Sequence, residues 1–234
     1  MTDTAKPEAL PPTPMTPTVA MIVTLGLVSA LCGLIIVGAY QGSLDAVKEN
    51  RRVAMQRAIE KVLPGAARTT AWHALADGSV VPAAAGADVP AGALAFHAAH
   101  DSAGALMGIA AEGAAKGYAD TVRVLFGWSS HCRCVVGLGV VSMRETPGIG
   151  DKILTDPAFL ANFKALDVQL DASLKALAHE VKAVKHGSKT QPWQVDAISG
   201  ATITSRAVAR AINDAAGALL PRLASNLAKI EKGQ

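Results

Sequence analysis

The sequence predicts an α+β fold, in which one transmembrane helix precedes a mixed domain of strands and helices. Residues 19–40 contain no charged side chain and are numerous enough to cross a bilayer. Residues 122–143 contain β-branched and apolar residues in the short runs that are typical of strands. After residue 202 the apolar residues recur at spacings of three and four, which is typical of a helix. Strands and helices in mixed order indicate an α+β domain.

The first predicted element is a transmembrane helix from Val19 to Tyr40, a run of 22 residues. At about 1.5 Å per residue it would span roughly 33 Å, enough for the bilayer hydrocarbon. A cleaved signal peptide is the alternative, because Val37–Ala39 resembles a cleavage site. The apolar run is too long for that, and Lys6 is the only basic residue before it. We therefore predict a retained helix that follows a tail of residues 1–18.

A second helical pattern follows the apolar run and ends at Pro64–Gly65. Its stripe consists of Leu44, Val47, Ala54, Ala58, Ile59 and Val62. We predict that residues 41–65 form a stalk helix and that residues 66–234 form one globular domain.

Two strands and a later helical region are predicted inside the domain. A half-buried strand begins at Gly117, and a turn near residues 128–130 pairs it with the apolar run Val135–Met143. Asp156 resembles a helix N-cap with proline at the first helical position. We expect this start to open one or two helices that continue to about Gly187.

The predicted strand that ends near Met143 leads into a loop from Glu145 to Lys152, with the sequence Glu-Thr-Pro-Gly-Ile-Gly-Asp-Lys. Pro147 ends strand pairing, and Gly148 and Gly150 permit a tight backbone path. Such a loop can present backbone N–H groups and the Thr146 hydroxyl to a ligand. An ordinary Pro-Gly turn is the alternative.

The most informative run is Asp-Ala-Ile-Ser-Gly-Ala-Thr, residues 196–202. Gly200 allows a positive φ or the close approach of a bulky ligand, and Ala201 keeps its neighbourhood small. A helix begins near Thr202, and Ser199, Thr202 and Thr204 are candidate N-caps. Its apolar positions are Val208, Ala209, Ile212, Ala216, Leu219 and Leu223. Because a helix start offers unpaired N–H groups and partial positive charge, it suits a phosphate diester.

These two segments together resemble the family of G subunits of Rnf-type ion-translocating electron transport complexes, whose FMN-binding domain is shared with the C subunit of the sodium-translocating NADH:quinone reductase. In that family a flavin transferase esterifies the FMN phosphate to the last threonine of the motif. The resemblance therefore implies that Thr202 carries covalent FMN. It implies non-covalent contacts from the upstream loop and from the rest of the motif: Glu145, Thr146, Gly148, Ile149, Ser199, Gly200, Ala201 and Thr204.

The resemblance also implies the function. The chain is expected to be a non-autonomous flavoprotein subunit that passes electrons inside a membrane translocase coupling reduced ferredoxin and NAD to ion movement. Its expected partners are other membrane subunits, the flavin transferase and the lipid bilayer. The sequence offers no nicotinamide site, since the Gly137-x-Gly139 pattern lies in a predicted strand. A quinone-reductase C subunit, another extracytoplasmic FMN carrier and a tethered assembly module without flavin remain alternatives.

The predicted topology brings two arguments into conflict. Residues 41–60 contain four basic side chains and residues 1–18 contain one, which by the positive-inside rule places the domain in the cytoplasm. The family resemblance implies the opposite, a single-pass protein of the cell inner membrane with its FMN domain on the periplasmic side. We favour the second topology, because the motifs are more specific than a difference of three charges.

Composition argues against other classes. A net charge of +3, without clustered basic and aromatic residues, disfavours nucleic-acid binding. The chain has three cysteines, too few for a four-cysteine iron–sulfur cluster. Cys132 and Cys134, beside His131, could contribute to a metal site or form a disulfide on one face of a strand. We expect buried or redox-incidental thiols there and no functional metal, and we assign no catalytic residue.

Overall fold

The computed structural model describes residues 17–83 and 89–231. Most of the predicted N-terminal tail therefore lies outside the described residues. The chain divides into two units, Met1–Asn50 and Arg51–Gln234. Helix α1, Thr18–Val62, runs through the segments predicted as membrane span and stalk and ends just before Pro64.

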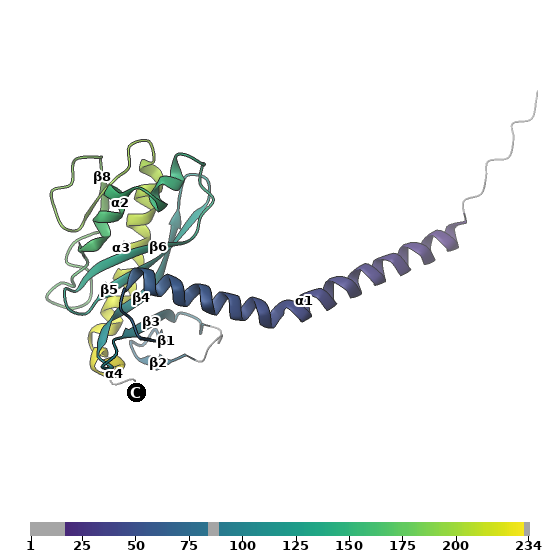
Figure 1. Cartoon of the computed structure of the whole chain (residues 1–234), viewed down its shortest axis with the longest axis horizontal. Helices are drawn as coiled ribbons and strands as arrows, with labels where there is room; N and C mark the ends of the chain where they lie inside the picture. Colours follow the sequence, from purple (N-terminus) through teal and green to yellow (C-terminus); the bar gives the residue numbers. More distant parts are fainter. Residues whose placement is uncertain (1–16, 84–88, 232–234) are drawn as a thin grey trace, which may run out of the picture. The chain divides into compact units, whose positions relative to one another are not determined.

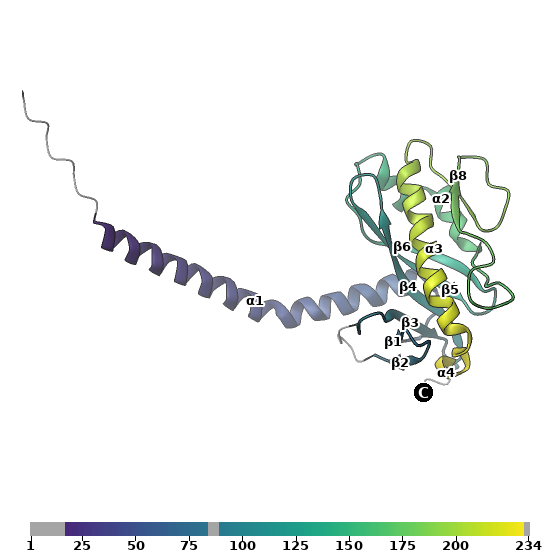
Figure 2. The ribbon, with the colours of Figure 1, turned by 180° about the vertical axis from the view of Figure 1, so that it is seen from behind.

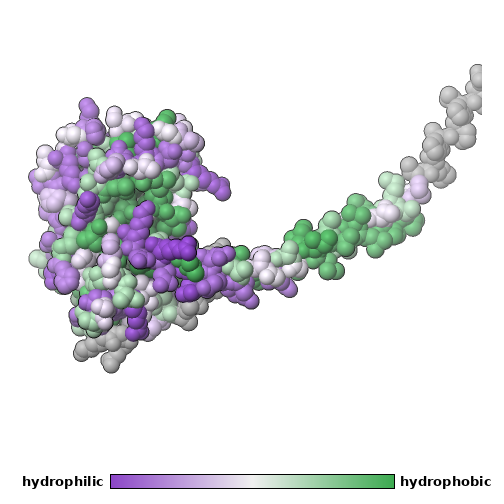
Figure 3. Space-filling model, viewed as in Figure 1, coloured by the Kyte–Doolittle hydropathy of each residue, from purple (hydrophilic) through white to green (hydrophobic). Residues whose placement is uncertain are grey.

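The first unit contains the apolar part of α1. The large apolar side chains of this part, residues 19–40, are all more than half exposed, and Val19, Leu25 and Leu34 are more than two-thirds exposed. Figure 3 shows the hydrophobic surface that they form on the visible side of the helix. Among the described residues, α1 is the one helix long and apolar enough to cross a membrane. This is consistent with a single-pass anchor.

The second unit is built on a seven-stranded antiparallel sheet with strand order β2-β1-β3-β4-β5-β6-β7 (Figure 1). The strands are β1 Arg68–Ala74, β2 Val80–Pro82, β3 Leu94–His100, β4 Leu106–Lys116, β5 Thr121–Ser129, β6 Cys134–Ser142 and β7 Leu166–Asp167. The predicted hairpin is confirmed as β5–β6. Its turn lies at residues 130–133, later than expected, because Trp128 and Ser129 still pair with Val135 and Cys134.

One face of the sheet packs against helix α3, Thr202–Ala224 (Figure 2). Alternate residues of β5, namely Val122, Val124 and Phe126, lie in this core with Val208 and Ile212 of α3. All six apolar positions that predicted this helix are buried. The close contact depends on Gly113 of β4, where a Cβ would overlap the backbone of α3.

The other face packs against the last turns of α1. Ile59, Val62 and Leu63 are buried against Leu125 of β5 and its neighbours in β3 and β4. Gly137 and Gly139 both lie in β6, as predicted for strand glycines. A Cβ at Gly137 would overlap the carbonyl group of Val62, so this glycine lets the helix end sit directly on the sheet.

The region after residue 156 differs from the prediction. Asp156 does cap a helix, accepting hydrogen bonds from the N–H groups of Ala158 and Phe159. However, α2, Pro157–Ala161, is short, and the prediction of helix to about Gly187 is wrong. Carboxylates such as Asp171 accept backbone N–H groups of tight turns, a local alternative to helix. The remaining elements are η1 Gly150–Leu154, η2 Asn162–Lys164, the parallel pair β8 Lys182–Val184 and β9 Gln194–Asp196, and α4 Leu227–Glu231.

An N-terminal apolar helix followed by a mixed domain confirms the predicted α+β class. The antiparallel sheet and helix α3 form two layers within the second unit. The pair β8–β9 adds a small second sheet beside them. The segments of interest for function, residues 145–152 and 196–205, meet at the N-terminal end of α3, where Glu145 bonds Thr204.

Candidate FMN site

The upstream loop is a tight turn with an exposed tip. The N–H groups of Ile149 and Gly150 both donate to the carbonyl oxygen of Thr146, at 3.2 and 3.0 Å. Gly148 has φ +76°, which fits the tight backbone path predicted there, and no atom beyond its chain neighbours lies within 4 Å of the position that a Cβ would take. Thr146, Gly148 and Ile149 are exposed. The turn therefore leaves open space over its glycine, which a planar ring could occupy.

Glu145 joins this loop to the downstream motif. Its Oε2 accepts a hydrogen bond of 2.6 Å from the hydroxyl of Thr204, and its carboxylate also accepts the N–H groups of Tyr118 and Ala119 at 3.3 and 3.2 Å. Partial burial raises the pKa of Glu145, but the bonds from Thr204 and from this backbone turn outweigh it and hold the pKa below its ordinary value. The charged carboxylate of Glu145 therefore connects three segments: its own loop, the turn at residues 118–119 and the start of α3.

The Ser-Gly-Ala-Thr run forms a turn that leads into α3. Gly200 has φ +84°, as predicted, and no described atom lies within 4 Å of its Cβ position. Ser199 and Gly200 are exposed, whereas Ala201 is buried. The small side chain at 201 thus fits the core, while the glycine opens the surface in front of the helix.

The prediction that Ser199, Thr202 or Thr204 caps α3 is wrong. Ala201 occupies the N-cap position, and no described side chain accepts from the first turn. Thr204 is directed to Glu145 instead, and Ser205 supports the turn, since its hydroxyl accepts the Ile198 N–H and donates to the Ala201 carbonyl. The N–H groups at the start of α3 are consequently left for a ligand.

The two threonines of the motif differ in availability. Thr204 is 2% exposed and its hydroxyl donates to a carboxylate. Thr202, the first residue of α3, is half-buried and contacts solvent. Of the two threonines at this helix start, Thr202 is therefore the one that is partly exposed to solvent.

A cavity of about 220 Å³ adjoins the motif. Its lining includes Ile198 and Ser199 of the motif, Lys152 from η1, His186, and the two carboxylates Asp156 and Asp196. The Nδ1 atom of His186 lies 3.1 Å from the Ala197 carbonyl oxygen and 3.6 Å from Asp196 Oδ2. An open glycine turn, an uncapped helix start and a nearby lysine suit the phosphate and ring of a flavin nucleotide. Sequence reasoning did not single out Lys152 as a contact, nor His186.

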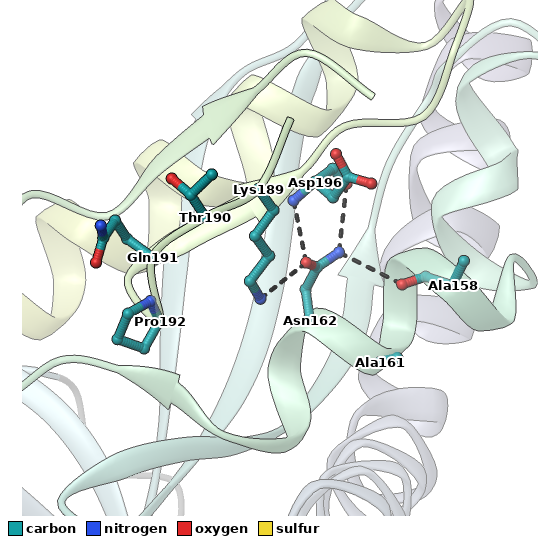
Figure 4. Close-up of a pocket in the computed structure, with 8 residues that line it drawn as sticks. All are labelled: Ala158, Ala161, Asn162, Lys189, Thr190, Gln191, Pro192 and Asp196. Carbon is teal, nitrogen blue, oxygen red and sulfur yellow. Dashed lines mark hydrogen bonds between the residues drawn. The ribbon is translucent and has the colours of Figure 1, made fainter. Parts of the chain in front are cut away.

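Asn162 holds the strand that leads into the motif. This buried side chain accepts the Asp196 N–H at 3.0 Å and donates to the Asp196 carbonyl at 3.3 Å. Figure 4 shows Lys189 reaching the same amide oxygen, at 3.1 Å, beside a depression of about 510 Å³. Burial lowers the pKa of Lys189, and Asp196 partly offsets this effect. No motif marks Asn162 in the sequence, because its role depends on a contact across 34 positions.

The two neighbouring cysteines form a disulfide, Cys132–Cys134. Cys132 lies in the β5–β6 turn and Cys134 is the first residue of β6, so the pair does not share a strand face as expected. Of the possibilities weighed for these residues, the disulfide is the one formed, so the expectation of incidental thiols is wrong. The described residues contain no group of three or more histidine, cysteine or acidic side chains that could hold a metal.

Residues 117–217 match the FMN-binding domain family, which covers the loop, the motif and most of α3. The class of the domain is therefore that of FMN-binding domains. The solved structure of NqrC from Shewanella oneidensis has the same fold: it is 21% identical, with a TM-score of 0.60 over 80% of this chain and 100% of that one.

Curated relatives define the family more closely. The G subunit of the ion-translocating oxidoreductase complex of Methanosarcina acetivorans is 30% identical over 198 residues, 83% of this chain and 90% of that protein. The protein of the same name from Pseudomonas aeruginosa is 33% identical over 193 residues, 80% of this chain and 81% of its own length. The chain belongs to the family of G subunits of ion-translocating oxidoreductase complexes. The family expected from the two motifs is confirmed.

Proposed function

We propose that this subunit carries FMN through a phosphoester to Thr202 and passes electrons between redox centres of its membrane complex. The observation that carries the proposal is the pair of threonines at the start of α3. Thr202 is partly exposed and follows the open turn at Gly200, whereas Thr204 is buried and its hydroxyl is bonded to Glu145. FMN supplies the electron-transfer chemistry when bound.

The remaining residues would hold and orient the cofactor. N–H groups at the start of α3, together with Ser199 and Lys152, offer donors and positive charge to the phosphate. Gly148 and Ile149 present an open, partly apolar surface to the flavin ring. The hydrogen bond between Glu145 and Thr204 would keep the 145–152 loop against α3. The contacts to the ring and to the phosphate would then keep a fixed distance from one another.

The direct test is to produce the full chain together with a flavin transferase and to denature it. We expect a fluorescent band on a denaturing gel. The intact mass should be higher by one esterified FMN. A chain that is never modified would instead favour a tethered assembly module without flavin, one of the alternatives considered from the sequence.

Gly148→Val is expected to loosen the flavin ring without releasing the cofactor. A β-branched residue is strained at φ +76°, at a cost of about 1–3 kcal/mol, and the new side chain would enter the space left for the ring. Flavin fluorescence should rise or the reduction potential shift, while the mass adduct stays.

Gly104→Val is the matched control for this substitution. Gly104 has φ +85°, has equally open surroundings and lies in the β3–β4 turn. It should lower stability similarly and leave flavin fluorescence and potential unchanged. If both variants match the parent in their flavin properties, the loop is an ordinary turn and the ring contacts proposed for residues 145–150 must be abandoned.

Asp196→Ala is expected to lower FMN occupancy when the transferase is present. Asp196 opens the motif, and its carboxylate accepts the Gly187 N–H at 2.7 Å on the surface beside both depressions. Asp171→Ala removes a comparable turn-capping carboxylate outside the motif and should leave occupancy intact. Full FMN occupancy in Asp196→Ala would mean that this carboxylate only stabilises the turn at residues 185–188.

We further propose that the chain is a single-pass protein of the cell inner membrane with residues 41–234 on the periplasmic side. The disulfide Cys132–Cys134 supports this topology, because such bonds persist in oxidising compartments. A reporter that is active only in the periplasm, fused after Gln234, should be active. Activity of a cytoplasm-only reporter at the same position would overturn the topology, as the basic residues after the span would predict.

A further inference from the structure

A second cavity, of about 150 Å³, lies at the other end of α3. Its apolar wall is formed by Leu220 and Leu223 of α3 and by Leu170 and Leu174 of the loop after β7. Leu220 is 18 residues beyond Thr202, about 27 Å along the helix. This cavity is thus separate from the proposed FMN site, and the inference below does not depend on that proposal.

One wall of this cavity carries an unpaired donor. Trp128, at the end of β5, lines the cavity and is 5% exposed. Its indole Nε1 is buried and has no hydrogen-bond partner among the described residues. Buried tryptophans usually satisfy this N–H, so the position calls for an acceptor that the described part of the chain does not supply.

The rim of the cavity combines two unusual backbone conformations. Among the described residues, Arg133 and Leu174 are the non-glycine residues with positive φ, at 54° and 57°, and both line this cavity. Such conformations are uncommon and concentrate at ligand-binding sites. Arg133 lies between the two cysteines of the disulfide, which closes the turn around it.

Among the residues that line this cavity, Arg133 is the one with a charged side chain. Arg133 contributes a guanidinium, for which the described residues provide no ion pair, and no aspartate or glutamate lines the cavity. A ligand would therefore meet the charged Arg133 and the side chain of Trp128, whose indole N–H lacks an acceptor, next to the apolar wall of leucines.

We propose that this cavity binds a small monocarboxylate with an apolar body, such as a single ring or a short alkyl chain. The leucines would enclose the apolar body, and the carboxylate would accept hydrogen bonds from Trp128 Nε1 and Arg133. A cavity of about 150 Å³ is large enough for one benzene ring. The charge of the rim selects an anion over a neutral ligand of the same shape.

The test uses the full chain in lipid nanodiscs, labelled with ¹⁵N-tryptophan, and phenylacetate as the probe. The three tryptophans give three indole N–H signals, and Trp128→Phe identifies the signal of Trp128. Titration should shift this signal saturably and leave those of Trp72 and Trp193 in place. Absence of a saturable shift up to tens of millimolar phenylacetate would overturn the proposal.

Three variants and one neutral probe sharpen the test. Arg133→Asn removes the cation but tolerates positive φ, and should weaken binding about tenfold or more. Ala224→Leu should abolish binding by filling the cavity that Ala224 lines. Arg68→Asn, an exposed charge that does not line the cavity, should leave affinity unchanged. Unchanged affinity in both cavity variants would place the ligand elsewhere, and benzyl alcohol binding as tightly as phenylacetate would overturn the carboxylate class.

Discussion

Thr202→Ala is expected to abolish covalent flavin attachment while the domain remains folded. The substitution removes the hydroxyl of the partly exposed threonine at the start of α3, and Thr204 is not placed to replace it because its hydroxyl is bonded to Glu145. Thr202 is half-buried at the first helical position, and alanine is favourable in a helix. The stability change should therefore stay within about 0.5 kcal/mol.

Intact mass and in-gel fluorescence of the co-produced chain measure this result directly. Thr202→Ala should lack the FMN adduct completely, and its thermal unfolding should match that of the unmodified parent. Thr204→Val is the matched control. It should keep the adduct but lose the bond to Glu145, a hydrogen bond to a charged group worth about 1.5–3 kcal/mol. A fluorescent band retained in Thr202→Ala would move the attachment, with Thr204 as the next acceptor to test.

Features encoded by neighbouring residues were predictable from the sequence. The apolar spacing after residue 202 predicted α3, and its positions are buried as expected. Alternation and a turn predicted the β5–β6 hairpin, and Asp156 before Pro157 predicted the cap of α2. The motif predicted that Gly200 could take a positive φ, and Gly148, which was predicted to permit a tight backbone path, has one as well. Each of these signals is local, because backbone sterics and periodicity act over a few residues.

Features that depend on distant contacts were not predictable. The Glu145–Thr204 hydrogen bond joins residues 59 positions apart, and it withdraws Thr204 from the capping role that local sequence suggested. Likewise, α2 ends early because Leu166 and Asp167 pair with β6 and the following carboxylates close turns. The Asn162 contact with Asp196 has no sequence signature. Tertiary contacts decide among local options that the sequence leaves open.

The sheet lies between the candidate FMN site and the end of α1. The candidate FMN site lies at the start of α3 on one face, and the end of α1 lies on the other. Gly127 and Gly137 sit beneath the carbonyl end of α1, where a Cβ on either would overlap Val62. These glycines therefore fix how closely the stalk end approaches the sheet that carries the site.

Gly137→Ala is accordingly expected to destabilise the domain strongly. Its Cβ would overlap the Val62 carbonyl oxygen and lie 2.7 Å from Val62 Cα, so the rigid helix end must move instead of a flexible side chain. That movement would disturb the packing of Ile59 and Leu63, at a cost of about 3 kcal/mol or more. Urea unfolding of the full chain in detergent, followed by tryptophan fluorescence, measures the loss.

Gly139→Ala is a close control, because it lies two residues along β6 and faces the same helix end. Its Cβ would lie 3.4 Å from Val62 Cγ1, an ordinary contact, and alanine also restricts the unfolded chain. The free energy of unfolding should then change by no more than about 1 kcal/mol, and the urea midpoint should shift little. Equal midpoints for the two variants would mean that the helix end yields easily. In that case the glycines would not fix the position of the last turns of α1 on the sheet.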